Sequence, residues 1–192
     1  MLFRSSLADK GVGLQSWVYR LGDLVKHYNL GDLADMDFTL IGNMITKMED
    51  EFLSVWERKV EANSKLDVFR SINKKFGYEE YLNSIQNFDW RKELTKIRIS
   101  AHKLMIERGR YQKLDRGERK CNVCKSGEIG DEIHFVLICG YYKNIREEYL
   151  QGCIKEAERL YGNQRKPEIF VHVMKNCDPN KLATFCWKAS QM

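Results

Sequence analysis

The sequence has few helix breakers and no long apolar run. Only two of its 192 residues are proline, and clusters of turn-forming residues are rare. The longest apolar run, residues 135–139, is far too short to cross a bilayer, and residues 1–13 contain no apolar segment of signal-peptide length. We therefore expect a mostly α-helical, intracellular protein without membrane contact, in the cytoplasm or the nucleus.

Constellations of catalytic residues are also missing. Asp and Glu are scattered, and no two carboxylates are spaced as a general acid and base. A zinc-dependent nucleobase deaminase would need a His-x-Glu motif ahead of its Cys-x-x-Cys motif and an open coordination position, and the sequence has neither. The sequence therefore predicts a binding or structural protein rather than an enzyme.

Six cysteines occur in a chain that shows no secretion signal. In a reducing compartment such cysteines bind metals more often than they form disulfides. Cys153, Cys177 and Cys186 have no partner at a recognisable spacing, and we interpret them as small buried hydrophobic residues.

The other three cysteines and one histidine form the pattern Cys121-x-x-Cys124, His134, Cys139. The gap of two residues lets both thiolates reach one ion from a tight turn. Three sulfurs and one imidazole then complete the tetrahedral ligand set of a structural zinc site. Because all four ligands come from the protein, no position stays open for a catalytic water.

A zinc ion bound by three thiolates carries a net charge of about −1. Arg119, Lys120 and Lys125 flank the motif and can offset this charge. The alternative is that three buried cysteines and one core histidine fall at this spacing by chance.

The step from His134 to Cys139 constrains the local backbone. Residues five apart on an α-helix point about 140° away from each other, so both cannot face one ion from the middle of a regular helix. We expect a helical turn that ends near Cys139, where Gly140 is well placed to terminate it. Three apolar residues are expected to form a small core behind the metal: Phe135, Leu137 and Ile138.

Apolar residues recur at helical spacing through most of the chain. The pattern predicts helices over about residues 14–30, 37–56, 66–76, 78–85, 89–108, 141–161, 167–174 and 179–189. Asp37 and Asp178 are expected N-caps, and the long apolar stripe of the second helix predicts packing between helices. The predicted fold is mostly α, with a small Cys-Cys-His-Cys zinc lobe inserted between helices. We divide it into a helical scaffold (1–88), a basic helix with the zinc lobe (89–146) and C-terminal helices (147–192).

Positive charge is concentrated just before and inside the metal motif. Residues 91–125 contain twelve Lys and Arg against four Asp and Glu, whereas the rest of the chain has 20 against 23. On the helix predicted from Asp89 to Arg108, basic side chains share one side and could follow a phosphate backbone of RNA or DNA. The candidate nucleic-acid contacts are Lys92, Lys96, Lys103, Arg110, Arg116, Arg119 and Lys120. A merely solvated charged face is the alternative.

His102 lies beside this basic stripe. No carboxylate stands at a spacing that would make it a catalytic partner. We therefore expect His102 to make a structural hydrogen bond or to lie against the metal lobe.

Four stretches between residues 94 and 146 have a recognisable sequence. They are LTKIRISAHKLMIERGRY at 94–111, Cys-x-x-Cys at 121–124, DEIHF at 131–135 and CGYYKNIR at 139–146. Together they resemble the C-terminal region of LINE-type (non-LTR) retrotransposon reverse transcriptases. The tail, with Phe170-x-x-x-Met174 and then Leu182-Ala-x-Phe185, is similar to the pattern that closes such proteins.

This resemblance implies that Cys121, Cys124, His134 and Cys139 bind zinc and that the basic flank contacts RNA or DNA. It also implies an upstream polymerase domain as a partner within the parent protein. Gly140 departs from the family, which often has proline there. The paired aspartates of a polymerase and the His, Asp and Glu of an endonuclease are both absent, so the chain would be the tail without the catalytic part. The alternatives are a structural or protein-interaction zinc module and an element fragment without function.

Overall fold

The computed structural model describes residues 17–32 and 37–192. Within these residues the protein is helical and contains no β-strand, apart from one isolated antiparallel bridge between Lys120 and Ile129. The Cys and His residues of the motif lie between helices, so the predicted mostly α fold with an inserted Cys-Cys-His-Cys lobe is confirmed. In the part of the chain that is described, every helix is too short or too polar to span a bilayer.

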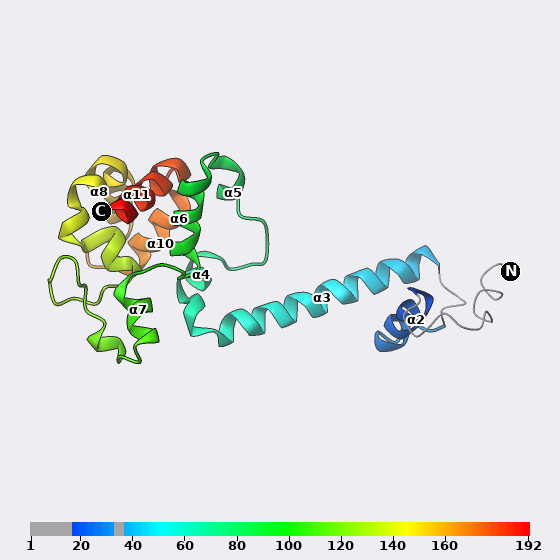
Figure 1. The fold of residues 1–192 in the computed structure, drawn as a ribbon. Coiled ribbons are helices and arrows are strands. Elements are labelled where there is room, and N and C mark those ends of the chain that lie inside the picture. The colour runs from blue at the N-terminus through cyan, green and yellow to red at the C-terminus, as the bar shows by residue number, and fades with distance from the viewer. Residues whose placement is uncertain (1–16, 33–36) are drawn as a thin grey trace. The chain divides into compact units, whose positions relative to one another are not determined.

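The helices follow one another along the chain, and the longer connections between them include residues 73–80 and 119–133 (Figure 1). The α-helices are α2 (Trp17–His27), α3 (Phe38–Ala62), α4 (Asp67–Ile72), α5 (Tyr81–Ser84), α6 (Phe88–Arg98), α7 (Met105–Tyr111), α8 (Lys143–Tyr149), α9 (Gln151–Tyr161), α10 (Lys166–Asn176) and α11 (Pro179–Gln191). Shorter turns are η2 (Ser64–Leu66), η3 (Arg116–Glu118), the π-helical η4 (His134–Ile138) and η5 (Gly140–Tyr142).

Contacts divide the chain into two compact units, residues 1–59 and 60–192. The division after residues 88 and 146 stays a prediction, and both of its boundaries fall inside the second unit. The core of that unit combines side chains from Ile72 to Ala189, so the segments before, within and after the metal motif share one hydrophobic interior.

In the first unit, hydrogen bonds join the end of α2 to α3. The Tyr28 hydroxyl donates to Glu51, and Lys47 Nζ donates to the carbonyl of Tyr28 at 2.6 Å. Asp37 caps α3 as predicted, because its Oδ1 accepts from the backbone N–H of Leu40 at 2.7 Å. The first predicted helix ends earlier than expected, at His27, and its residues 14–16 lie outside the described residues, as does the segment 1–13.

The apolar stripe of α3 is not buried between helices, contrary to the prediction. Phe38 is 94% exposed, and Ile41, Ile45 and Met48 are also exposed. Spacing alone showed that these residues share one face, but it could not show whether another helix covers that face.

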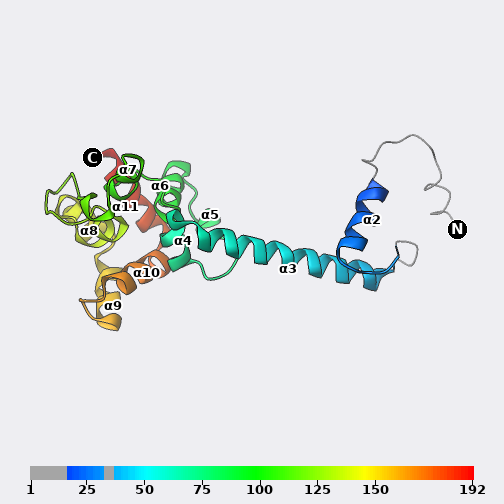
Figure 2. The ribbon, with the colours of Figure 1, turned by 90° about the horizontal axis from the view of Figure 1, so that it is seen from below.

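In the second unit, α11 packs against α6 and α8, and α10 packs against α9 and α4 (Figures 1 and 2). Asp178 caps α11 through its Oδ1, which accepts from Lys181 N at 2.9 Å, and Pro167 stands in the first turn of α10, both as predicted. Phe185 of α11 is fully buried, with its ring centroid 5.3 Å from that of Phe135. This aromatic contact joins the last helix to the turn that carries His134.

The single helix predicted over residues 89–108 is wrong. The helix α6 begins after Asn87, whose side chain accepts from Asp89 N and Trp90 N, so Asn87 rather than Asp89 is the N-cap. It ends at Arg98, and α7 starts only at Met105. Two other predicted helices also differ: the third ends at Ile72, and the helix over 141–161 is interrupted at Leu150.

A buried carboxylate holds the segment between α6 and α7. Glu132 Oε1 lies 2.8 Å from both Ser100 Oγ and His102 Nε2, and Ser100 has a left-handed backbone with φ of 50°. The predicted structural hydrogen bond of His102 is confirmed. Burial alone would raise the pKa of Glu132, but the hydrogen bonds and charge of His102 and the bond from Ser100 outweigh it and hold this pKa below its ordinary value. The helix therefore breaks where side chains from the linker reach Glu132.

Replacing this carboxylate should destabilise the second unit. We expect Glu132→Gln to lower the free energy of unfolding by about 1–3 kcal/mol, because a buried ionised acceptor of two hydrogen bonds is lost. Urea unfolding of the metal-loaded protein measures the change. Glu147→Gln, an exposed carboxylate on α8, is the matched control and should stay within about 0.5 kcal/mol. Equal unfolding midpoints for the two variants would contradict the proposed role of Glu132.

Candidate metal centre

The structure brings the four predicted ligands together. One ligand atom from each of Cys121, Cys124, His134 and Cys139 lies within 4.8 Å of all the others. In a tetrahedral site with metal–sulfur bonds of about 2.3 Å, neighbouring sulfurs lie about 3.8 Å apart, so the cluster has the size of a single-ion site. The four side chains could therefore hold one metal ion.

The first two ligands stand on a knuckle closed by backbone hydrogen bonds. Cys121 N donates to the carbonyl of Glu128 at 2.8 Å, and Gly130 N donates to the carbonyl of Arg119 at 2.9 Å. A Cβ atom on Gly130 would lie 2.9 Å from Cys121 Cα, so the two backbones can approach this closely only because residue 130 is glycine. The turn that follows the first two ligands contains Gly127, with φ of 79°.

The other two ligands come from the π-helical turn η4. Cys139 N donates to the carbonyl of His134 at 2.7 Å, which is the i to i+5 bond of a π-turn. This wider turn brings residues five apart onto one side, which a regular α-helix cannot do. Asp131 Oδ1 accepts from His134 N at 2.9 Å and fixes the start of the turn.

The turn ends at Cys139, as predicted. Gly140 does not terminate the chain of helical turns, however, because η5 begins there. Of the core expected behind the metal, Phe135 is buried, whereas Ile138 is 38% exposed and Val136 takes its place in the interior.

The metal-free thiols differ in electrostatic environment. Burial raises the pKa of Cys139 to about 12. Burial also acts to raise the pKa of Cys124, but hydrogen bonding with Ser126, Cys121 and His134 outweighs it and lowers this pKa to about 6. A bound cation favours the thiolate form of every cysteine ligand, so metal binding would displace the proton of Cys139.

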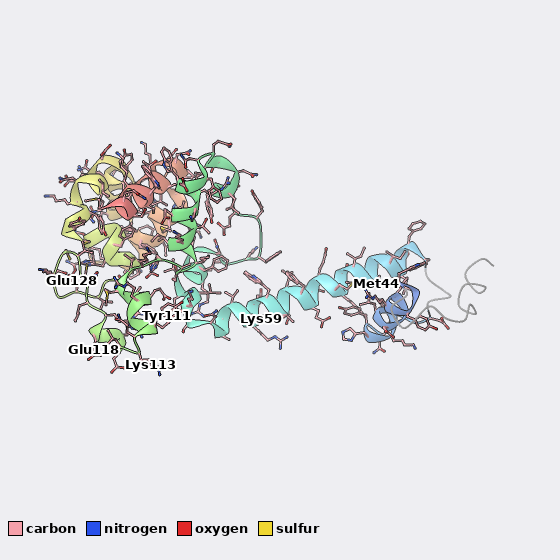
Figure 3. All side chains as sticks on the ribbon, in the orientation of Figure 1. Met44, Lys59, Tyr111, Lys113, Glu118 and Glu128 are labelled. Carbon is pink, nitrogen blue, oxygen red and sulfur yellow. The ribbon has the colours of Figure 1, made fainter. Side chains whose placement is uncertain are left out.

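A carboxylate outside the ligand set orients the histidine. Glu128 Oε2 lies 2.9 Å from His134 Nδ1, while His134 Nε2 lies 3.2 Å from Cys124 Sγ (Figure 3, which labels Glu128). This hydrogen bond favours a proton on Nδ1 and leaves Nε2 free to bind a metal, as carboxylates that bond to histidine ligands do in metalloproteins. Sequence analysis did not identify Glu128. In the sequence, the only indication of this role is that Glu128 lies in the turn between the second and third ligands.

The seven basic residues predicted to contact nucleic acid do not form one stripe, because the helix that would carry them is broken. Three of them have structural partners. Arg110 pairs with Glu107 at 3.1 Å, and Arg119 donates to the carbonyls of Ile106 and Leu114. Lys96 pairs with Glu93 at 2.6 Å. The remaining four are exposed: Lys92, Lys103, Arg116 and Lys120.

A groove with a volume of 560 Å³ lies beside the metal cluster. It is lined by the segment between α6 and α7, by Cys121 and His134 of the cluster, and by the end of α11. Lys103 and Arg108 line it as exposed cations, and Arg108 forms no ion pair within residues 17–32 and 37–192. Arg108 was not among the predicted contacts, because it lies off the stripe of a continuous helix.

With four protein ligands, this cluster leaves no position for a substrate or a reactive water, so a metal here would stabilise structure. Comparison of the chain with models of protein families, with curated proteins and with solved structures finds no match in any of the three.

Proposed function

We propose that residues 60–192 form a zinc-stabilised module that binds the phosphate backbone of RNA or DNA. The observation that carries this proposal is the four-ligand cluster with unpaired cations around it. A set of three thiolates and one imidazole suits zinc in tetrahedral geometry, whereas calcium and magnesium prefer oxygen ligands. The contact of Glu128 with His134, which orients the imidazole for metal binding, also supports zinc.

The nucleic-acid part of the proposal is supported by exposed positive charge near the cluster. No ion pair in the described residues involves any of the following six exposed side chains: Lys103, Arg108, Lys113, Arg116, Lys120 and Lys125. Lys113 lies just beyond Tyr111 at the end of α7 (Figure 3). An unpaired cation at the surface is well solvated by water. When it neutralises a phosphate, the release of counterions contributes favourably to the free energy of binding.

The sequence likeness to the C-terminal region of LINE-type reverse transcriptases supports the same proposal. Under it, the module would hold template RNA or target DNA beside a polymerase domain of the same parent protein. The zinc lobe would position the cations, and the chain would contribute binding rather than catalysis.

Charge reversal tests the proposed surface. The triple variant Lys103→Glu, Arg108→Glu, Lys120→Glu should bind a labelled single-stranded RNA or a DNA duplex at least about 100-fold more weakly at 0.1 M salt. The slope of log K against log salt should become shallower by about 2–3, because each lost phosphate contact contributes about 0.7–0.9. Fluorescence anisotropy over a range of salt concentrations measures both quantities.

A matched control reverses the same number of charges elsewhere on the second unit. Lys155→Glu, Arg159→Glu and Lys181→Glu change exposed residues of α9 and α11. If the control weakens binding as much as the test variant, the net charge of the protein explains its affinity for nucleic acid, and the proposed surface is wrong. If the wild type binds neither probe, the nucleic-acid proposal is wrong.

A second candidate function, protein interaction, is favoured by the apolar face of α3. Phe38, Ile41, Ile45 and Met48 follow steps of three and four residues and are exposed. Such a stripe is typical of a helix that docks against a partner. This candidate would gain support if the protein retained its zinc but showed no salt-dependent binding to either nucleic acid.

A further inference from the structure

One buried arginine of the second unit lacks the partners that such a residue normally has. Arg146 of α8 is only 9% exposed, and its Nη1 has no hydrogen-bond partner. Among the residues that the structure describes, no carboxylate forms an ion pair with it. A buried guanidinium is costly unless a negative charge compensates it.

The other buried arginine shows the usual arrangement. Arg98 is 6% exposed, and its guanidinium donates to the carbonyl of Met174 at 2.9 Å and to Glu79 at 2.7 Å. It also lies over the ring of Tyr81, 4.7 Å from the centroid. The same protein thus satisfies one buried arginine fully and leaves the other without an acidic partner.

The helix that carries Arg146 lies against the metal centre. This helix, α8, begins directly after η5 and packs against η4, whose C-cap is Cys139. Burial lowers the pKa of Arg146, and negative charge on Cys139 opposes this shift more than that on the exposed Glu147. Tyr142 senses the same field, because charge on Cys139 and Cys121 adds to burial in raising its pKa to about 12.

A metal bound in the cluster would in turn leave a negative charge that needs a compensating cation. Three thiolates and one divalent ion leave a net charge of about −1 around side chains that include the fully buried Cys139. The flanking cations expected to offset it are all less buried than Arg146. The guanidinium of Arg119 is bound to backbone carbonyls, and Lys120 and Lys125 are exposed to water.

We infer that Arg146 compensates the charge of the metal centre, so that its buried guanidinium raises the affinity of the three thiolates and His134 for the ion. Within the described residues, the guanidinium of Arg146 has no negative partner without the metal-bound cluster, and the cluster has no buried positive partner without Arg146. Both charges are compensated when the metal is bound. This role rests on the proposed zinc centre. Arg146 touches no substrate and acts only through the ligand cluster.

The test measures zinc affinity of the full chain by competition with a chromophoric chelator. Arg146→Met should lower the affinity about 10–100-fold, the range typical of outer-shell partners. Arg146→Lys, which keeps the charge, should recover most of this loss. Lys143→Met removes the same charge from an exposed position on the same helix and should change the affinity less than about threefold.

Circular dichroism of the zinc-loaded variants checks the fold, and the thiolate-to-cobalt absorption of the Co²⁺ form checks that the thiolates still bind. If Arg146→Met does not fold, Arg146→Gln takes its place. Equal losses for Arg146→Met and Lys143→Met, or no recovery with Arg146→Lys, would overturn the inference and leave Arg146 a packing residue. A wild-type protein that binds no zinc would instead refute the centre itself.

Discussion

Cys124→Ser should abolish tight zinc binding and unfold at least residues 115–145. Cys124 is half-buried, so the substitution removes a ligand without opening a cavity in the core. Structural zinc contributes about 10–16 kcal/mol of apparent binding free energy in zinc-finger peptides, and small metal lobes owe most of their stability to it. Elemental analysis should give near one zinc per wild-type chain and almost none per variant chain.

Hydrogen exchange locates the effect of this substitution along the chain. The backbone amides of residues 115–145 should lose protection both in the variant and in wild-type protein treated with a chelator. Cys153→Ser makes the same chemical change at a half-buried cysteine outside the cluster and should leave zinc content unchanged. If chelation removes the zinc while protection of the lobe persists, the metal is dispensable for its structure.

Phe185→Ala should lower the free energy of unfolding by about 3–5 kcal/mol. Phe185 is fully buried, and its removal leaves a cavity against Phe135, the residue that follows the ligand His134. The loss is a large part of the stability of an ordinary domain, which is about 5–15 kcal/mol. Urea unfolding of the zinc-loaded protein measures it.

The control for this core substitution is Phe88→Ala. Phe88 is 66% exposed and contacts Arg91, whose guanidinium lies 5.9 Å from the ring centroid. Its removal should cost less than about 1 kcal/mol. A similar cost for the two variants would mean that the contact between α11 and η4 does not support the fold.

The fold class and the clustering of Cys121, Cys124, His134 and Cys139 could be predicted from sequence, because both depend on local spacing. The two-residue gap between Cys121 and Cys124 and the caps at Asp37 and Asp178 act within a few residues of chain. The five-residue step from His134 to Cys139 excludes a regular α-helix, and the structure has a π-turn there.

The errors arose where distant residues decide the backbone or the partner of a side chain. Residues 89–108 have helical periodicity throughout, but Glu132 draws Ser100 and His102 into a linker. The sequence also does not show whether the side chain of a Lys or Arg is free or bound to a partner. Only the structure separates Arg119, which holds backbone carbonyls, from Arg108, which is exposed beside the groove.

The order of synthesis determines when the aromatic contact between Phe135 and Phe185 can form. The four ligands occupy residues 121–139, so the lobe closes through local contacts, which form fast. Phe185 leaves the ribosome 50 residues after Phe135, roughly 3–10 s later at a rate of about 5–20 residues per second. During that interval all four residues of the cluster are already present, while Phe135 still lacks the ring of Phe185. Under the proposed zinc binding, metal supply therefore acts on the nascent chain before α11 is synthesised.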